Sequence, residues 1–240
     1  RLDKLKMLKN TDSDIYHYHI YTRRDSNIIY DDDDFRRFKK GSDDTREVEK
    51  NKVYDYLLSN NTLNYKEQLN QYSPKIYSIY QNIQRFIKNG TPTGKILFYS
   101  DFRADAGSEA FELVLKSNGY EKYDPNKPYT KQKRYTFITG SEGSEERRLN
   151  KEAFNDPNNK YGEFIQIMII SGAGAEGISL FCVRQVHILE PYWNFIRINQ
   201  VFGRAKRMKS HTGKEGDIDY PWLPSEKRNV EQYLYLTTLP

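Results

Sequence analysis

The feature that most constrains the fold is a nearly continuous apolar run at residues 163–171, EFIQIMIIS. A strand with one face in water alternates apolar and polar residues, whereas a strand covered by helices on both faces reads as an apolar run. The run is also far shorter than the roughly 20 residues that a membrane-spanning helix needs. It therefore indicates a strand buried on both faces of an α/β sheet.

Short apolar segments alternate with helical patterns from about residue 72 onward. Further strands are predicted at residues 95–100 (KILFYS), 134–140 (RYTFITG), 185–190 (QVHILE) and 230–239. Helices are predicted from residue 74, around residues 110–119, at about residues 144–154 with Ser144 as N-cap, and at about residues 194–208 with Asn194 as N-cap. This alternation predicts an α/β domain with a mostly parallel sheet flanked by helices.

Residues 1–71 differ in character from the rest of the chain. Four consecutive aspartates at residues 31–34 precede a basic cluster at residues 36–40. Such a block is typical of a solvated insertion, and a regulatory or partner-binding loop is the alternative. We therefore divide the chain into a variable, partly irregular region at residues 1–71 and an α/β domain at residues 72–240.

Composition limits the kinds of site that the chain can hold. Cys182 is the single cysteine, which excludes an internal disulfide and a cysteine metal site. His17 and His19 lack a third donor at metal-binding spacing, so no metal site is predicted. The start of the chain has no Met and no signal-peptide stretch, and we expect a fragment of a longer cytoplasmic protein. The net charge of +5 is compatible with a nucleic-acid partner.

The strongest chemical signal is QVFGRAKR at residues 200–207. At about 100° per residue, Gln200, Arg204 and Arg207 share one face of a helix, and His211 continues it. Apolar side chains mark the opposite face: Phe195, Ile198, Val201, Phe202 and Ala205. Two arginines one turn apart present rigid forks of donors, which suit a phosphate. A solvated basic face on an amphipathic helix is the alternative.

A glycine-rich loop, SGAGAEGIS, follows the buried run at residues 171–179. Glycines at 172, 174 and 177 let backbone amides approach a ligand closely, and Ser171 adds a hydroxyl. Ligands of open α/β sheets gather at the carboxyl ends of strands, where this loop lies. Taken alone, such a loop is better explained as a tight structural turn.

The order of these segments resembles the C-terminal, second RecA-like domain of superfamily 2 helicases over residues 72–239. Residues 200–207 match the Q-x-x-G-R-x-x-R of motif VI, residues 171–179 resemble motif V, and residues 96–100 (ILFYS) resemble motif IV. Residues 137–154 resemble the segment between motifs IV and V, with its Glu-Arg pair at Glu146 and Arg147. Residues 190–194 (EPYWN) resemble a stretch of Swi2/Snf2-like members. The residues at the motif positions are most similar to those of a branch in large DNA viruses. This branch includes the poxvirus early transcription factor small subunit and nucleoside triphosphatase I.

The resemblance implies roles for individual residues. Arg204 and Arg207 would be arginine fingers at the γ-phosphate of ATP, and Gln200 would contact the phosphate or the attacking water. ATP binding or coupling is implied at Gly174, Glu176, Gly177 and Gly203. Nucleic-acid contacts are implied at Ser100, Phe102, Arg103, Arg147, Ser171 and Gly172. Gly172 departs from the family, because many relatives have an acidic residue there, and this puts the family's ribose contact in question.

The sequence contains neither a phosphate-binding loop nor an acidic Mg²⁺ box. Residues 90–95 (GTPTGK) imitate such a loop but have three intervening residues instead of four, and Ile96 replaces the Mg²⁺-binding hydroxyl. ATP and Mg²⁺ are therefore expected to be held mainly by a first RecA-like lobe, to which residues 1–71 would lead. The chain alone is expected to be inactive.

We predict the second lobe of an ATP-dependent helicase or translocase, active in viral transcription. Expected partners are DNA bound without sequence preference, the first lobe of the same polypeptide and a viral RNA polymerase, and no membrane. The expected location is the host cytoplasm, the viral factory or the virion. The alternative is a catalytically silent module, derived from such a lobe, that binds DNA or docks onto an RNA polymerase.

Overall fold

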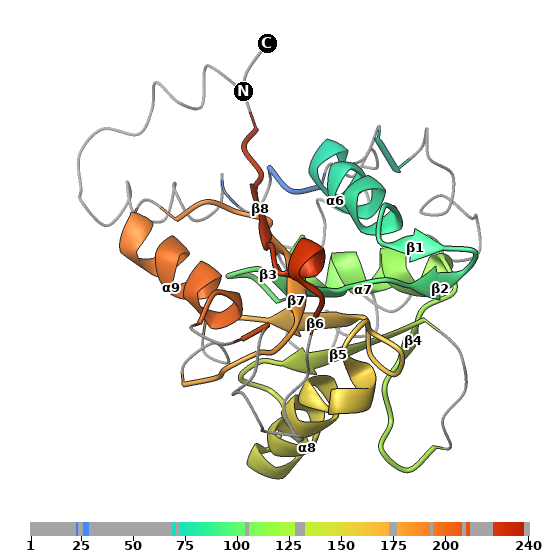
Figure 1. Ribbon diagram of the computed structural model, residues 1–240. Coiled ribbons are helices and arrows are strands. Elements are labelled where there is room, and N and C mark those ends of the chain that lie inside the picture. Colours follow the sequence, from blue (N-terminus) through green and yellow to red (C-terminus); the bar gives the residue numbers. More distant parts are fainter. Residues whose placement is uncertain are drawn as a thin grey trace, which may run out of the picture.

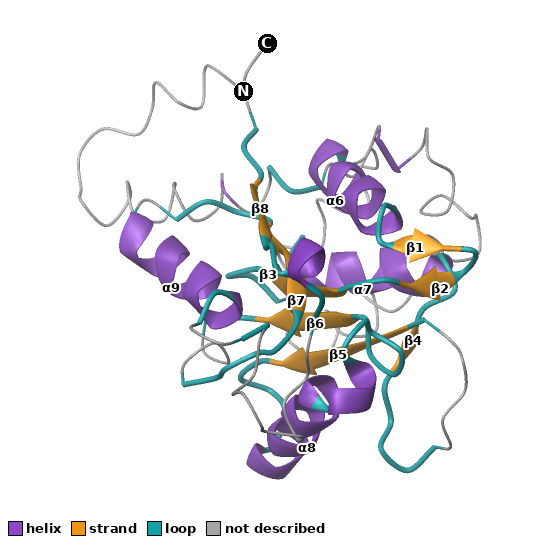
Figure 2. Cartoon of the chain, in the orientation of Figure 1, coloured by secondary structure: helices purple, strands orange, loops and turns teal. Residues whose placement is uncertain are grey.

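One parallel sheet organises the described part of the chain (Figure 1). The computed structural model describes residues 23, 26–28, 69–70, 73–103, 106–127, 133–172, 177–192, 194–207, 210–211 and 223–237. The strands of the sheet are β3 (Lys95–Tyr99), β4 (Glu121–Lys122), β5 (Arg134–Ile138), β6 (Ile167–Ile170), β7 (Val183–Ile188) and β8 (Glu231–Leu234). All are parallel, in the order β4-β5-β6-β3-β7-β8 (Figure 2). This confirms the predicted α/β fold.

Helices cover both faces of the sheet. They are α6 (Pro74–Gln84), α7 (Ser108–Ser117), α8 (Ser144–Asn155) and α9 (Phe195–Ala205). Two 3-10 turns (Pro157–Asn159 and Ser225–Lys227) and a small hairpin of β1 (Ile87–Lys88) and β2 (Thr91–Pro92) complete the described elements. Helices α6 and α7 pack on one face, and α8 and α9 pack on the other. Within the described residues, no helix has the length and apolarity to cross a membrane.

Strand β3 lies in the middle of the sheet and contributes to both cores. Ile96 and Phe98 face the α6–α7 layer, while Leu97 faces the α8–α9 layer. The ring of Phe98 stacks on that of Phe111 in α7, with centroids 4.0 Å apart. Beside it, all four residues of β6 are buried. The predicted doubly covered strand is confirmed, but it begins at Ile167 and covers only part of the run at residues 163–171. Burial of each such side chain stabilises the fold by roughly 1.5–3 kcal/mol.

The helix boundaries follow the capping residues at most positions. Ser73 accepts a hydrogen bond from the amide of Ile76 at the start of α6, and Asn194 accepts one from the amide of Ile196 at the start of α9. Gly119 follows α7 with φ of +78°, the left-handed conformation that favours glycine after a helix. The prediction of Ser144 as N-cap is wrong by one residue, because Gly143 holds that position.

The predicted side-chain orientations are wrong for two residues, one at the start of α9 and one beyond its end. Phe195, expected against the core, is 68% exposed, because α9 begins at this residue and its first turn projects beyond the sheet (Figure 1). His211, expected on the solvent face, is buried and its Nε2 lies 2.7 Å from the carbonyl oxygen of Val183. The helix ends at Ala205 instead of about residue 208, so helical spacing no longer orients His211.

Parts of the region before residue 72 pack against the α/β domain. Ile28 and Leu69 are buried in the α6–α7 core. Asn27 is fully buried, and its Nδ2 donates to the carbonyl of Ala106 (3.1 Å) and to Oε1 of Glu190 (2.7 Å). The acidic run at residues 31–34 lies outside the described residues. The proposed boundary at residue 72 stays a prediction.

The segment that imitates a phosphate-binding loop has a structural role. Residues 91–92 belong to the β1–β2 hairpin, and Lys95 opens β3. The Lys95 side chain is fully buried, and its Nζ donates to the backbone carbonyl of Phe154 at 2.6 Å. The same Nζ lies 4.5 Å from the centre of the Phe154 ring. Burial lowers the pKa of Lys95 to about 8. A lysine enclosed in this way is not available to a phosphate.

Candidate nucleotide and nucleic-acid site

Three strands end side by side at the carboxyl edge of the sheet. Tyr99 at the end of β3 pairs with Ile170 of β6 and with Ile188 of β7. The segments after these strands, residues 100–103, 171–172 and 189–190, therefore share one edge. Five residues with predicted nucleic-acid contacts lie in these segments: Ser100, Phe102, Arg103, Ser171 and Gly172.

The predicted phosphate-binding face of α9 is present as an open depression. It has a volume of about 410 Å³ and is lined by Gln200, Gly203, Arg204 and Arg207. The Arg207 guanidinium donates to the hydroxyl of Ser179, and the carbonyl of Arg204 accepts from the amide of Leu180 at 3.2 Å. The end of α9 is thus tied to the segment that follows the glycine-rich loop.

The chemistry of this lining fits the phosphates of ATP. Two guanidiniums and one amide offer several donors, and none of the four lining residues is a carboxylate. Mg²⁺ prefers carboxylate and water oxygens, which these side chains do not supply. No group of three or more potential metal ligands occurs in the part of the chain that the structure describes. The lining therefore suits an anion and leaves Mg²⁺ to other residues.

The glycine-rich loop is described only at its ends. Gly172 is half-buried, and Gly177 is exposed with φ of +71°, a conformation that disfavours other residues. Gly174 and Glu176, predicted to couple nucleotide and nucleic acid, lie outside the described residues.

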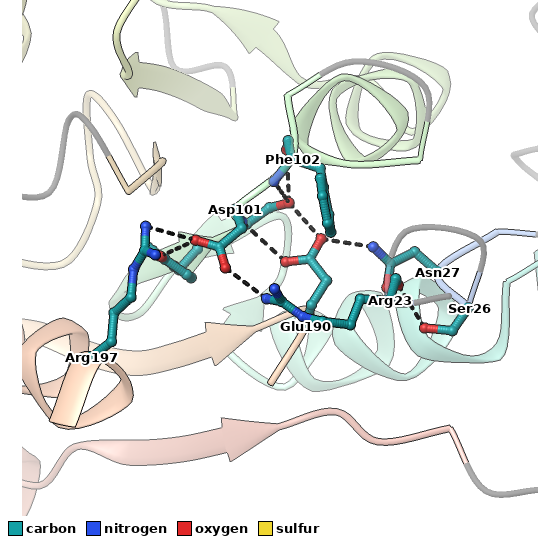
Figure 3. Close-up of polar contacts among 9 residues, drawn as sticks. Arg23, Ser26, Asn27, Asp101, Phe102, Glu190 and Arg197 are labelled. Atoms are coloured by element: carbon teal, nitrogen blue, oxygen red, sulfur yellow. Dashed lines mark hydrogen bonds and ion pairs between the residues drawn. The ribbon is translucent and has the colours of Figure 1, made fainter. Parts of the chain in front are cut away.

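Ser100 is held by a buried carboxylate from the neighbouring strand end. Its hydroxyl lies 2.6 Å from Oε1 of Glu190, and the side chain is fully buried. Glu190 also accepts from the amide of Asp101 (3.1 Å) and from Asn27 (Figure 3). Burial raises the pKa of Glu190 to about 7, although the hydrogen bonds from Ser100 and Asp101 act in the opposite direction. The Ser100 hydroxyl therefore ties the ends of β3 and β7 together, and its nucleic-acid contact stays a prediction.

Asp101 is the centre of a second polar cluster at the same edge. Arg23 donates to its Oδ2 at 2.6 Å, and Arg197 of α9 pairs with its Oδ1 at 3.1 Å. Figure 3 shows the two arginines approaching this carboxylate from opposite sides. The ring of Tyr192 lies within 5.0 Å of the Arg23 guanidinium and 4.7 Å of the Arg197 guanidinium. Arginines, carboxylates and aromatic rings are therefore interleaved here.

Arg103 and Arg147 differ in their surroundings from this cluster. Arg103 lies 3.4 Å from Glu109 and 3.8 Å from Glu142, so two carboxylates already face its guanidinium. Arg147 lies in the first turn of α8, and its side chain is half-buried. None of the contacts found among the described residues joins Arg147 to the carboxyl edge.

Sequence reasoning did not identify the cluster around Asp101. Arg23 gave no usable signal, because it lies 78 positions from Asp101 in the chain. The position of Arg197 could have been noticed in the sequence, because it is a cation in the first turn of α9, which contains no acidic residue. A cation there opposes the helix macrodipole and is better explained by an anionic partner.

The comparisons with known proteins identify the family of the chain. Residues 78–209, more than half of the chain, match the family described as the helicase conserved C-terminal domain. The chain belongs to this family. The resemblance of its motifs and its RecA-like fold are thereby confirmed.

The relatives of this helicase domain include proteins of large DNA viruses, as the residues in its motifs predicted. A candidate ATP-dependent RNA helicase of Acanthamoeba polyphaga mimivirus is 32% identical over 173 residues, 72% of this chain and 27% of the relative. The termination factor NPH-I homolog of African swine fever virus is 32% identical over 197 residues, 68% of this chain and 26% of the relative. The helicase domain thus spans about a quarter of the length of these relatives.

The solved structures that resemble the helicase domain include the C-terminal part of the Fun30 ATPase domain. Its TM-score is 0.44 at 22% identity, and the match covers 67% of this chain and 41% of that chain.

Proposed function

We propose that the chain is the second lobe of an ATP-dependent nucleic-acid translocase or helicase that acts in viral transcription. Arg204 and Arg207 serve as arginine fingers, and Gln200 contacts the phosphate or the attacking water. The first RecA-like lobe of the same polypeptide holds most of the nucleotide. The isolated chain is therefore inactive, and its active site forms only when both lobes meet.

The observation that carries this proposal is the composition of the depression on α9. Gln200, Arg204 and Arg207 line one open surface beside Gly203, with no carboxylate in the lining. The four residues share one side of α9 and the segment just after it, so the hollow by itself does not separate a phosphate site from a solvated basic face. The absence of a carboxylate from the lining and the contact of Arg207 with Ser179 favour the phosphate site. Because Arg207 is exposed and reaches Ser179, its guanidinium is held near the glycine-rich loop.

The arrangement suggests how this lobe contributes to hydrolysis. ATP with Mg²⁺ supplies the phosphoryl group, whose transfer to water develops negative charge on the terminal oxygens. Arg204 and Arg207 place fixed positive charge opposite those oxygens, which stabilises the transition state more than the ground state. An arginine in this role contributes roughly 10³- to 10⁵-fold in rate.

We place the nucleic-acid track at the carboxyl edge, where segments after β3 and β6 meet. Contacts at such an edge are to the sugar-phosphate backbone, so binding is largely independent of sequence. DNA is the proposed track, and a viral RNA polymerase is the proposed partner, since one relative is named as a termination factor. The proposed location is the host cytoplasm, the viral factory or the virion.

The test is ATP hydrolysis by the full-length protein, with and without single-stranded and duplex DNA. The comparison is between wild type, Arg207→Ala and the neighbouring control Lys206→Ala. Lys206 is exposed and does not line the depression. We expect DNA to stimulate the wild type and the control equally. We expect Arg207→Ala to lose at least about 10³-fold in kcat while it still binds ATP.

A different outcome favours a module without catalysis. If the wild type hydrolyses no ATP, or if Arg207→Ala retains full turnover, the arginine-finger role is wrong. DNA binding or polymerase docking by such a protein would then identify it as a silent module derived from a helicase lobe.

A further inference from the structure

We propose that Arg197 binds a phosphodiester group of the nucleic-acid strand, that Asp101 positions it, and that Gly172 leaves the space it occupies. This inference rests on the proposed function, because it adds a residue to the track at the carboxyl edge. It concerns a side chain that does not belong to motif IV, V or VI.

The first observation is the position of the Arg197 guanidinium above Gly172. A Cβ placed on Gly172 would fall well inside contact distance of Nη2 of Arg197, and 3.4 Å from its Cζ. Gly172 is not among the glycines with positive φ, so its backbone does not require glycine. The missing side chain instead makes room for a guanidinium at the carboxyl end of β6.

The second observation is which group of the Asp101–Arg197 pair meets solvent. The Asp101 side chain is 10% exposed, whereas the Arg197 side chain is 40% exposed. An approaching strand therefore meets the guanidinium first, with the carboxylate behind it. Asp101 also accepts from the Tyr99 hydroxyl, which fixes the carboxylate and, through it, the arginine. The Arg197 guanidinium also hydrogen-bonds Tyr99 and Tyr192. It has five N–H groups, so one contact to each of these three partners leaves donors for a second anion.

The third observation is the place of Arg197 in its helix. It lies three residues after the Asn194 cap, in a first turn that contains no acidic residue. The positive end of the helix macrodipole disfavours a cation there, by about 0.3–1 kcal/mol at exposed positions. The same macrodipole favours a bound anion, so a phosphate would gain from both the helix end and the arginine. Helix stability therefore does not explain Arg197. Its pairing with Asp101 does, and a phosphate at the helix end would add to that attraction.

The surroundings of Arg197 suit a strand more than an isolated anion. The Tyr192 and Phe102 rings are half-buried, and the Arg23 guanidinium lies 5.5 Å from the Phe102 ring. Half-exposed rings beside arginines provide surfaces on which bases stack without sequence preference. Arg23, Arg197 and Lys75 carry three positive charges against Asp101 and at most one charge on Glu190, so the cluster remains attractive to a phosphate.

The same geometry bears on the sugar of the strand. A side chain at position 172 could reach a ribose hydroxyl, but Gly172 has none, and the guanidinium above it recognises phosphate. The contact from Arg197 is therefore present on both deoxyribose and ribose backbones. We expect single-stranded DNA and RNA of the same sequence to respond equally to loss of Arg197.

The experiment measures binding of a fluorescent single-stranded DNA 20-mer to the full-length protein by anisotropy, without ATP, at several salt concentrations. Variants are Arg197→Ala, Arg197→Lys, Gly172→Ala and the double variant Arg197→Ala/Gly172→Ala. Arg148→Ala is the control, because Arg148 is also a half-exposed, ion-paired arginine but lies on α8 with Glu145 and Glu152. Duplex DNA and RNA of the same sequence are measured in parallel. Thermal unfolding shows whether each variant is folded.

We expect Arg197→Ala to weaken binding about 10-fold. The slope of log affinity against log salt should become shallower by about 0.7, the value for one single-strand phosphate. Arg197→Lys should keep the slope, because it keeps the charge. Gly172→Ala should weaken binding by displacing the guanidinium, and should have no further effect once Arg197 is alanine.

Several results would overturn the inference. One is an Arg197→Ala variant that loses thermal stability but keeps wild-type affinity and salt slope, since that identifies a purely structural ion pair. Additive effects of the Gly172 and Arg197 substitutions, or no strand binding by the wild type, would do the same. ATP turnover plays no part in this measurement, so failure of the arginine-finger proposal leaves the result interpretable.

Discussion

A cation lies against an aromatic ring at each end of β3, but one of these cations is buried and the other is exposed to solvent. At the amino end, the Lys95 ammonium lies 4.5 Å from the centre of the Phe154 ring and is completely buried. At the carboxyl end, the Arg197 guanidinium lies 4.7 Å from the centre of the Tyr192 ring and remains 40% exposed. One cation is enclosed by the fold, and the other stays open to a ligand.

The difference shows why a cation near a glycine-rich segment is not by itself a phosphate site. Lys95 follows a loop that imitates a phosphate-binding motif, yet its Nζ donates to a backbone carbonyl inside the core. Arg197 belongs to no recognised motif, yet it lies where three strands end and a helix begins. In a parallel sheet, connections at the carboxyl ends leave crevices for ligands, so the strand end decides which cation is available.

The largest effect should come from removing the ring at the amino end. Phe154→Ala leaves a cavity in the α8–α9 core, where Phe154 is fully buried, and should lower the free energy of unfolding by about 4 kcal/mol. Strand binding by the folded protein should not change. Urea denaturation and anisotropy measure the two properties, and Phe195→Ala is the control, because Phe195 is 68% exposed and should cost less than about 0.5 kcal/mol. Lost strand affinity in folded Phe154→Ala would show that the two ends are coupled.

The next largest effect concerns Glu190, which is buried behind the carboxyl end. Its pKa is raised from 4.5 to about 7, mainly by burial, so the folded state favours the protonated form. The stabilisation this gives is fully present below pH 4.5 and is lost as pH rises through 7. Relative to Glu190→Gln, the wild type should lose up to about 3 kcal/mol of unfolding free energy over that range.

Urea unfolding of both proteins at a series of pH values checks this difference. His187, whose pKa burial lowers to about 3, destabilises the fold in acid, but this contribution is common to both proteins and cancels. Asp101, Arg23 and Lys75 also surround the carboxyl edge. Because Glu190 raises the pKa of Lys75, the two proteins are compared between pH 4.5 and 7, below the Lys75 pKa of about 8. If the difference in unfolding free energy between the two proteins stays constant with pH, the pKa of Glu190 is not raised in the folded state. The hydrogen bonds to Glu190 would then offset the effect of its burial on the pKa.

The smallest effect should come from the cap of α9. Asn194→Ala removes the acceptor for the Ile196 amide, which lies 2.8 Å away, and should cost about 1 kcal/mol of stability. Because Arg197 lies in the same first turn, strand affinity should fall slightly, by less than about threefold. Asn194→Asp retains an acceptor and should restore stability. Loss of affinity as large as that of Arg197→Ala would show that the helix end itself contributes most of the binding.

Local patterns predicted most of the fold, as three segments illustrate. The run at residues 163–171 contains the buried strand β6, α6 begins at residue 74 as predicted, and Asn194 caps α9 as predicted. These features depend on contacts within a few residues, so residue type and spacing suffice to predict them. The spacing of Gln200, Arg204 and Arg207 likewise predicted a shared surface, and the structure places them around one depression.

Predictions that depended on distant contacts were incomplete or wrong. Phe195 and His211 have the orientations opposite to those expected, because the helix begins at one and ends before the other. The nucleic-acid contact predicted for Ser100 stays a prediction, but the sequence did not show that its hydroxyl donates to Glu190, 90 positions away in the chain. No local pattern encodes a partner at that separation.

By itself, the sequence determined the α/β class, the helicase family and the arginine pair, because periodicity and motif spacing are local properties of the chain. Only the tertiary structure decided that Lys95 is enclosed, that Asp101 holds Arg23 and Arg197, and that Gly172 lies beneath a guanidinium. The physical reason is the sheet order, which places the ends of β3, β6 and β7 side by side. The strand ends, and with them residues as distant in the chain as Asn27 and Glu190, 163 positions apart, meet only once that order has formed.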